Sequence, residues 1–332
     1  MKFGPVPLDQ AEGAVLAHSV ALTDGRLRKG RVLSAQDVAA LRAAGQDSVI
    51  VAQLGPSDVG EDAAAEALAK AVQGQAQGVR AGQAFTGRVN LLAEGPGVVQ
   101  LDVAALTAIN AVDPMITIAT VPPFQQMAPG GMIATIKIIS YGVDSGALDR
   151  AVAAAGAGAL TLCPPKLRSA RLIVTDIEGG VGDKGREAIA QRLAALDVDL
   201  RAVVMVPHRR APLSAALSEA EEDLLLILTG SATSDIEDVA PAALRAAGGT
   251  IERFGMPVDP GNLLFLGHIG ARPVIGLPGC ARSPALNGAD WVLSRIICGI
   301  EVTGADIAGM GVGGLLKEIP TRPQPRRGKD KT

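Results

Sequence analysis

DLLLILTGSATSDIEDVAPAALRAAGG, residues 223–249, decides the fold predicted for this chain. Residues 223–228 are an aspartate followed by a short apolar run, whose length and following turn favour a strand buried on both faces over a buried helix. Small residues, namely serine, threonine, alanine and glycine, fill positions 229–234, where the chain can turn sharply and expose backbone N–H groups to an anion. A helix follows, with Pro241 near its first turn and a glycine pair at its end. Strand, loop and helix in this order predict a ligand site at the carboxyl edge of a parallel sheet.

The same alternation of strand and helix continues on both sides of this unit. Strands and helices that alternate at this spacing form a parallel sheet with right-handed crossovers. The sequence therefore predicts an α/β domain over residues 168–318. Its other elements are strands at residues 171–176, 201–206 and 273–276 and helices at residues 185–196, 214–222, 239–247 and 287–298.

Residues 1–75 are predicted to form a small α/β module ahead of this domain. Ser34 is a typical helix N-cap, and Gly45 is a typical residue to end the helix that Ser34 begins. The order of elements is βαβ-like. The predicted strands lie at residues 13–20 and 48–54, and the predicted helices at residues 35–44 and 62–73.

Residues 80–145 have a different character, because short apolar runs alternate there with frequent glycine and proline. FTGRVNLL, GVVQL, ITIATV and MIATIKIIS are the runs, and one helix around residues 103–110 interrupts them. We predict a β-rich domain of the small barrel or sandwich type. Residues 320–332 are proline-rich and basic, which is typical of a disordered tail.

Composition narrows the classes of protein to consider. Hydrophobic residues make up 48% of the sequence and aromatic residues 2%, so aliphatic cores are predicted. The formal net charge is −3, and the basic residues are scattered until the C-terminal tail, which gives no footprint for nucleic acid. The N-terminus lacks an apolar signal core, and no stretch approaches the roughly 20 apolar residues of a membrane span. We predict a soluble, cytoplasmic protein with neither nucleic acid nor membrane as a partner.

No metal site and no disulfide are predicted. Cys163, Cys280 and Cys298 are widely spaced, with no CxxC motif and no nearby histidine pair. Acidic residues gather at the start of the predicted helix at residues 62–73, where the helix dipole favours negative charge. We interpret them as part of the helix rather than as metal ligands.

Three motifs resemble those of the molybdopterin-binding domains of molybdenum cofactor biosynthesis. VTD at residues 174–176, with DKG at residues 183–185, looks like that family's first strand and loop, and GLPG at residues 276–279 resembles a late turn. The central motif has the family's TGG-T-G-x-x-x-x-D-V-x-P-x-A spacing without a gap, and its matching residues are Thr229, Gly230, Asp238, Val239, Pro241 and Ala242. Together with MPVDPGNLL and GLPGCARSP, these motifs resemble most the molybdopterin-binding half of proteins that are fused to a cytidylyltransferase.

The resemblance implies a three-layer fold with a parallel sheet and a molybdopterin site at the strand ends, with Mg²⁺ and molybdate as further candidate ligands. It implies catalytic roles for Asp238 and Asp176. Each of these has a structural alternative, since Asp238 can cap the following helix and Asp176 can form a turn. The residues implied in cofactor binding are Thr229, Gly230, Ser231, Ala232, Thr233, Gly276, Pro278, Gly279, Arg282 and Ser283.

Two departures from the family pattern bear on nucleotide chemistry. Ser-Ala-Thr at residues 231–233 stands where adenylylating members usually have glycines, and side chains there narrow the approach of the backbone to a pyrophosphate. His208 or Arg209 stands where a carboxylate usually helps to hold magnesium and nucleotide. Both departures weaken the expectation of Mg-ATP chemistry. Arg209 and Arg210 are predicted either to grip the ligand phosphate or to form a solvated pair.

The function predicted from these features is binding of molybdopterin or molybdenum cofactor, in cofactor biosynthesis or delivery. An enzyme remains the alternative, either a Mg-ATP-dependent molybdopterin adenylyltransferase or a molybdate-insertion enzyme. The missing glycines and the missing carboxylate favour a carrier or regulator. An α/β hydrolase has no support, because the sequence has no G-x-S-x-G motif. The resemblance implies a homo-oligomer, with a cytidylyltransferase or an apo-molybdoenzyme as a candidate protein partner.

Overall fold

The computed structural model of the chain describes residues 1–22, 25–180 and 182–316. Two compact units divide it, one made of residues 1–95 with 99–162 and the other of residues 96–98 with the chain from 163 onward. The predicted tail at 320–332 and the last two residues of the predicted α/β domain lie outside the described residues.

The N-terminal module has its helix between β2 (Val15–Leu16) and β5 (Ser48–Gln53), in the predicted strand-helix-strand order, and its strands pair antiparallel. Strands β1 (Lys2–Pro7), β5 and β2 form a sheet in which β5 pairs antiparallel with both neighbours. Prolines obscured β1 in the sequence, although an edge strand tolerates them. The predicted strand at 13–20 is split into β2 and β3. The remaining elements are a turn of 3-10 helix (Leu8–Gln10), β3 (Val20–Leu22), β4 (Gly25–Leu27) and α1 (Ala35–Ala43).

The second part contains more helix than the predicted β-rich domain. Its core joins helix α2 (Glu61–Gln73) to the sheet β10-β12-β8-β7, so α2 packs here rather than within the N-terminal module. Alanines and leucine on one face of α2 are buried against β8 and β12, which the sequence pattern alone does not reveal. The other elements are β6 (Asp58–Gly60), β7 (Val79–Ala81), β8 (Arg88–Ala93), β9 (Gly97–Leu101), α3 (Val103–Val112), β10 (Ile116–Thr120), β11 (Gln126–Met127), β12 (Met132–Ile138), β13 (Gly142–Asp144), α4 (Ser145–Ala154) and β14 (Leu160–Cys163).

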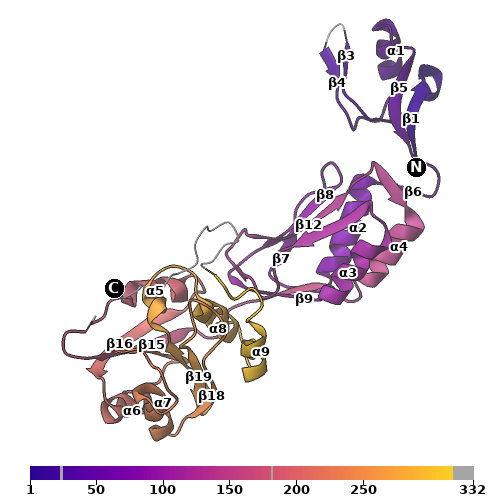
Figure 1. The fold of residues 1–332 in the computed structure, drawn as a ribbon. Coiled ribbons are helices and arrows are strands. Elements are labelled where there is room, and N and C mark those ends of the chain that lie inside the picture. Colours follow the sequence, from indigo (N-terminus) through magenta and orange to yellow (C-terminus); the bar gives the residue numbers. More distant parts are fainter. Residues whose placement is uncertain (23–24, 181, 317–332) are drawn as a thin grey trace, which may run out of the picture. The chain divides into compact units, whose positions relative to one another are not determined.

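The C-terminal part has the predicted α/β architecture, with a six-stranded sheet in the order β16-β15-β17-β20-β19-β18. The pairings show that every strand except β19 runs in the same direction. Helices α5 and α8 lie on one side of the sheet and α6 and α7 on the other, which confirms the three layers (Figure 1). The strands are β15 (Ser169–Asp176), β16 (Asp199–Pro207), β17 (Leu224–Leu228), β18 (Thr250–Phe254), β19 (Phe265–Ile269) and β20 (Arg272–Leu277), and the helices are α5 (Arg186–Ala194), α6 (Arg210–Ser218), α7 (Val239–Ala246), α8 (Gly288–Ile297) and α9 (Gly304–Gly309).

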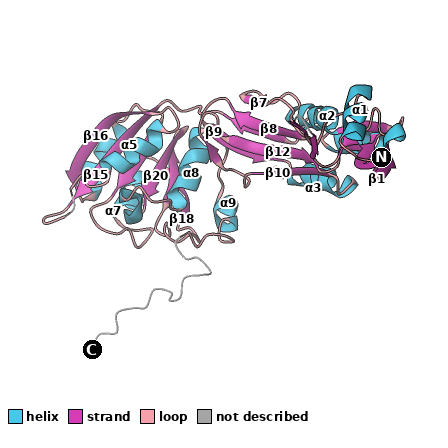
Figure 2. Cartoon of the chain, turned by 90° about the horizontal axis from the view of Figure 1, so that it is seen from above, coloured by secondary structure: helices cyan, strands magenta, loops and turns pink. Residues whose placement is uncertain are grey.

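Strand β17 is the centre of this sheet, as its sequence predicts. All five of its residues are buried, because β15 and β20 flank it and helices cover both faces. Figure 2 shows the strands of this part as neighbouring arrows with helices before and behind them. Helix α6 begins at Arg210, four residues ahead of the prediction, since Pro212 is acceptable in a first helical turn. Within the described residues, no helix has the length and apolar character that a membrane span requires.

Candidate functional site

Four strand ends meet at one edge of the six-stranded sheet. The register places Asp176 of β15 beside Pro207 of β16, and Leu228 of β17 beside Leu277 of β20. Because these strands are parallel, the loops that follow them emerge at the same edge, where open α/β folds bind ligands. The predicted binding residues of the loops after β17 and β20 are therefore brought to one edge, as the sequence predicted.

The loop after β17 is anchored to the end of β15 through Gly230. Its N–H donates to the Thr175 hydroxyl at 3.0 Å. A Cβ atom on Gly230 would lie 2.7 Å from the carbonyl oxygen of Thr175, so the chain can approach β15 this closely only with glycine. The Gly230 amide, which the sequence offered to a ligand, is thus used within the protein.

The next three amides of this loop point to anion binding. In the described part of the chain, the N–H groups of Ser231, Ala232 and Thr233 have no hydrogen-bond acceptor. Ser231 and Ala232 are exposed, while Thr233 is buried with its hydroxyl 3.3 Å from that of Thr229. The Thr229 hydroxyl also donates to the carbonyl of Ser231 at 2.6 Å. Successive unpaired amides in a fixed turn suit an oxyanion.

Asp238 closes the same loop and begins helix α7. Its Oδ1 accepts from the Val239 N–H at 2.7 Å, and its Oδ2 accepts from the Ser234 N–H at 3.1 Å. Both carboxylate oxygens therefore accept hydrogen bonds from backbone N–H groups, as the helix-capping alternative predicts. A catalytic role for Asp238 stays a prediction. Asp176, at the end of β15, is exposed.

Arg282 joins the loops rather than standing apart as a surface cation. Its guanidinium donates to the carbonyl oxygen of Thr229 at 2.9 Å, to that of Gly182 at 3.4 Å, and to that of Lys184. Burial lowers the pKa of Arg282 from its usual value. Gly185, at φ +102°, leaves room for it, since a Cβ there would come within 2.7 Å of the Arg282 backbone. Arg282 thus shapes the loops after β15 and β17.

The GLPG motif divides into a buried half and an exposed half. Gly276 is buried in β20, and a Cβ on it would lie 1.9 Å from the Phe265 ring. Pro278 is also buried, whereas Gly279 and Ser283 are exposed at the sheet edge. Gly276 therefore serves the packing of β20 against β19, and of the GLPG residues Gly279 is the one exposed at the edge.

Two family models match parts of the chain. Residues 5–53 match a domain of unknown function (DUF8806). Residues 168–296 match the model described as "Probable molybdopterin binding domain". Over residues 168–296, the α/β part therefore matches this family of molybdopterin-binding domains. The match confirms the resemblance read from the motifs, and no curated protein matches the chain.

Two of the solved structures similar to the chain are of molybdopterin biosynthesis proteins. A molybdopterin biosynthesis MoeA protein from Pyrococcus horikoshii is 12% identical, with 90% of this chain and 75% of that chain covered and a TM-score of 0.32. The molybdopterin biosynthesis enzyme MoaB from Thermus thermophilus is 23% identical, with 39% of this chain and 89% of that chain covered and a TM-score of 0.30. TM-scores this low carry no argument about function, so the assignment depends on the family match.

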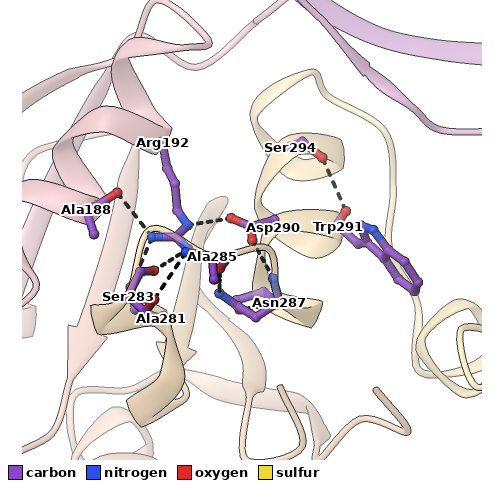
Figure 3. A network of polar contacts seen from close by, with 10 residues as sticks. Ala188, Arg192, Ala281, Ser283, Ala285, Asn287, Asp290, Trp291 and Ser294 are labelled. Carbon is purple, nitrogen blue, oxygen red and sulfur yellow. Dashed lines mark hydrogen bonds and ion pairs between the residues drawn. The ribbon is translucent and has the colours of Figure 1, made fainter. Parts of the chain in front are cut away.

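Arg192 is a residue of the molybdopterin-binding domain that sequence reasoning missed. It extends from α5 toward the segment after β20 (Figure 3), where it donates to the carbonyls of Ala281 at 3.0 Å and Ser283 at 2.8 Å, and it pairs with Asp290 of α8. In the sequence it is one charged residue of an amphipathic helix, 91 positions from Ser283. No local signal distinguishes it from a solvated arginine.

A cavity of about 530 Å³ opens beside the start of α5 in the molybdopterin-binding domain. Asp183, Gly185, Arg186, Glu187 and Ala190 line it. Gly185 also contacts Arg282, so the cavity adjoins the loops that Arg282 holds. Within residues 1–22, 25–180 and 182–316, no three His, Cys, Asp or Glu side chains are grouped as a metal site.

Proposed function

We propose that the chain binds molybdopterin or the molybdenum cofactor at the carboxyl edge of the six-stranded sheet, and that it acts in cofactor biosynthesis or delivery. The observation that carries this proposal is the row of unpaired amides at residues 231–233, which lies in the motif that resembles the family. Molybdopterin carries a phosphate, and backbone amides at a sheet edge are suited to oxyanions.

The donor set at this edge fits such a ligand. The loop amides offer neutral donors, while Arg209 and Arg210 are exposed at the end of β16 and add positive charge. Asp176 is an exposed carboxylate at the neighbouring strand end, and it is our candidate to accept hydrogen bonds from the pterin ring. Asp238 has both oxygens on backbone amides, so its proposed contribution is to fix the loop.

The side chains at residues 231–233 favour binding and delivery over adenylylation. They are larger than the glycines of the family pattern, and the position of the expected carboxylate is held by His208 or Arg209. Titration of the purified protein with molybdopterin, and separately with Mg-ATP, tests this choice. Pterin binding without ATP turnover is expected. Formation of an adenylylated product would contradict the proposal that the protein is a carrier.

Ala232→Asp is expected to weaken molybdopterin binding about tenfold, which corresponds to about 1.4 kcal/mol. Ala232 is exposed in the amide loop, so an added carboxylate would face the ligand phosphate. Ala271→Asp is the matched control, because Ala271 is an exposed turn residue between β19 and β20 at the opposite edge of the sheet. Isothermal titration calorimetry measures both. Equal affinities for the two variants would place the ligand elsewhere.

A cytidylyltransferase or an apo-molybdoenzyme is the proposed recipient of the bound cofactor, and a homo-oligomer is the proposed assembly. Mg²⁺ and molybdate stay candidate co-ligands. Support for these comes from the family resemblance of the α/β domain. Light scattering of the purified chain tests the assembly, and a mass equal to one chain would contradict it.

A further inference from the structure

His208 lies beside the end of β15, at the carboxyl edge of the sheet that forms the candidate site. It follows β16 directly, and its backbone N–H donates to the carbonyl of Asp176 at 2.9 Å. This bond fixes the residue against the end of β15. Its side chain is half-buried, and it occupies or adjoins the position where the family pattern has a carboxylate.

The imidazole of His208 and the amide loop share one buried anchor, the hydroxyl of Thr175. That side chain is 1% exposed. Its Oγ1 lies 3.0 Å from the Gly230 N and 2.7 Å from the His208 Nδ1. Because both partners contact the same oxygen atom, the imidazole ring and the start of the loop at residues 231–233 are neighbours.

The shared hydroxyl sets the tautomer of His208. A backbone amide can only donate, so Thr175 Oγ1 accepts from Gly230. Within the described residues, His208 Nδ1 is the one acceptor that the Thr175 hydroxyl hydrogen can reach. The hydroxyl therefore donates to Nδ1, and the neutral ring carries its hydrogen on Nε2.

This tautomer decides what His208 can bind. A protonated Nε2 has no lone pair for a metal ion, but it is a hydrogen-bond donor. Nothing in the described part of the chain accepts from Nε2. Arg209 and Arg210, which follow in sequence, are exposed and add positive charge at the same strand end. A carboxylate at this position would repel an anion, whereas this imidazole attracts one.

We propose that His208 is a specificity residue that donates from Nε2 to a phosphate oxygen of the bound pterin, and that Thr175 is the positioning residue that sets its tautomer. This inference rests on the proposed function, because that function supplies the phosphorylated ligand. It explains how the domain would hold an anion at or beside the position where the family pattern has a carboxylate. The imidazole would therefore favour the phosphorylated form of the ligand over the dephosphorylated form.

The tautomer is tested without any ligand by ¹⁵N NMR of the histidine side chains, with the His208 signals assigned from a His208→Gln variant. The hydrogen is expected on Nε2 in the wild-type protein and in Thr175→Ser, which keeps the hydroxyl. Thr175→Val removes the hydroxyl at nearly constant volume and is expected to lose this preference. A hydrogen on Nδ1 in the wild-type protein would overturn the assignment.

The specificity is tested by titration with molybdopterin and with its dephosphorylated form. His208→Ala is expected to lower the affinity for the phosphorylated ligand about tenfold. The affinity for the dephosphorylated ligand is expected to stay unchanged. His268→Ala is the matched control, since His268 contacts the Thr250 hydroxyl at 2.8 Å in the hairpin of β18 and β19, away from the site. Equal weakening of both ligands, or no weakening, would overturn the proposal.

The two proposals fail in different ways. If the wild-type protein binds neither form of the pterin, the proposed function is wrong, and inorganic phosphate then decides the role of His208. A change of the His208 Nε2 resonance on phosphate addition, absent for His268, supports an anion donor that serves another ligand. An unchanged resonance would remove the anion role as well.

Discussion

Replacement of Arg192 by alanine is expected to lower the free energy of unfolding of the molybdopterin-binding domain by about 3–5 kcal/mol. The side chains of Arg192 and Asp290 are only 11% and 15% exposed, so the variant leaves a carboxylate in a poorly solvated place. It also leaves the carbonyls of Ala281, Ser283 and Ala285 without their donor. Urea unfolding monitored by circular dichroism measures the change.

Arg201→Ala is the control for the Arg192 variant, because Arg201 forms an ion pair of the same type with Asp199 on the surface of the same domain. Those side chains are 62% and 73% exposed and their charged atoms lie 3.7 Å apart. Exposed pairs of this kind contribute below about 1 kcal/mol. Similar losses for Arg192→Ala and Arg201→Ala would show that the pair with Asp290 does not hold the segment after β20. Arg192→Lys should recover only part of the loss, since lysine lacks the planar fork that spans several carbonyls.

Gly276→Ala is expected to lower the free energy of unfolding by about 2–3 kcal/mol, because it overpacks the core. The new Cβ atom would stand 1.9 Å from the Phe265 ring, so β19 and β20 cannot both keep their positions. Gly279→Ala is the control from the same motif. A Cβ at Gly279 meets nothing within 4 Å, and its cost is expected to stay below about 0.5 kcal/mol.

The cause of the Gly276 effect is tested by a second substitution at Phe265. Phe265→Leu reduces the ring to a smaller side chain, so the double variant should lose less stability than the two single variants combined. Strict additivity would show that the ring is not the obstacle. This outcome would assign Gly276 to ligand binding, as the family resemblance implies. Titration of Gly276→Ala with molybdopterin would then show a loss of binding free energy larger than the loss of unfolding free energy.

Local sequence determined the elements of the α/β domain well. The apolar run at Leu224–Leu228 became the central strand, and Asp238 became the cap of α7, because burial on two faces and helix capping leave signals within a few residues. The motifs at residues 174–176, 229–242 and 276–279 likewise indicated the molybdopterin-binding domain that the family model matches.

Sequence was less informative where strands pair at a distance. The N-terminal module has alternating apolar residues that fit a parallel or an antiparallel partner, and its pairing of Lys2–Pro7 with Ser48–Gln53 is antiparallel. Helix α2 has an apolar face that any neighbouring sheet could cover, and the sheet containing β8 and β12 covers it. An amphipathic pattern indicates that one face of a helix is buried, but it does not indicate which strands or helices cover that face.

By itself, the sequence determined which residues can donate or accept at the edge of the sheet. Only the tertiary structure decided which of these groups are already engaged: the Gly230 amide by Thr175, Arg282 by carbonyls of two loops, and Arg192 by a segment about 90 residues away. The physical reason is that a residue type fixes its hydrogen-bonding capacity, whereas its partner depends on strands and helices that meet only in the fold. The groups that stay unpaired after folding, the amides at residues 231–233 and the Nε2 of His208, are the ones a ligand can use.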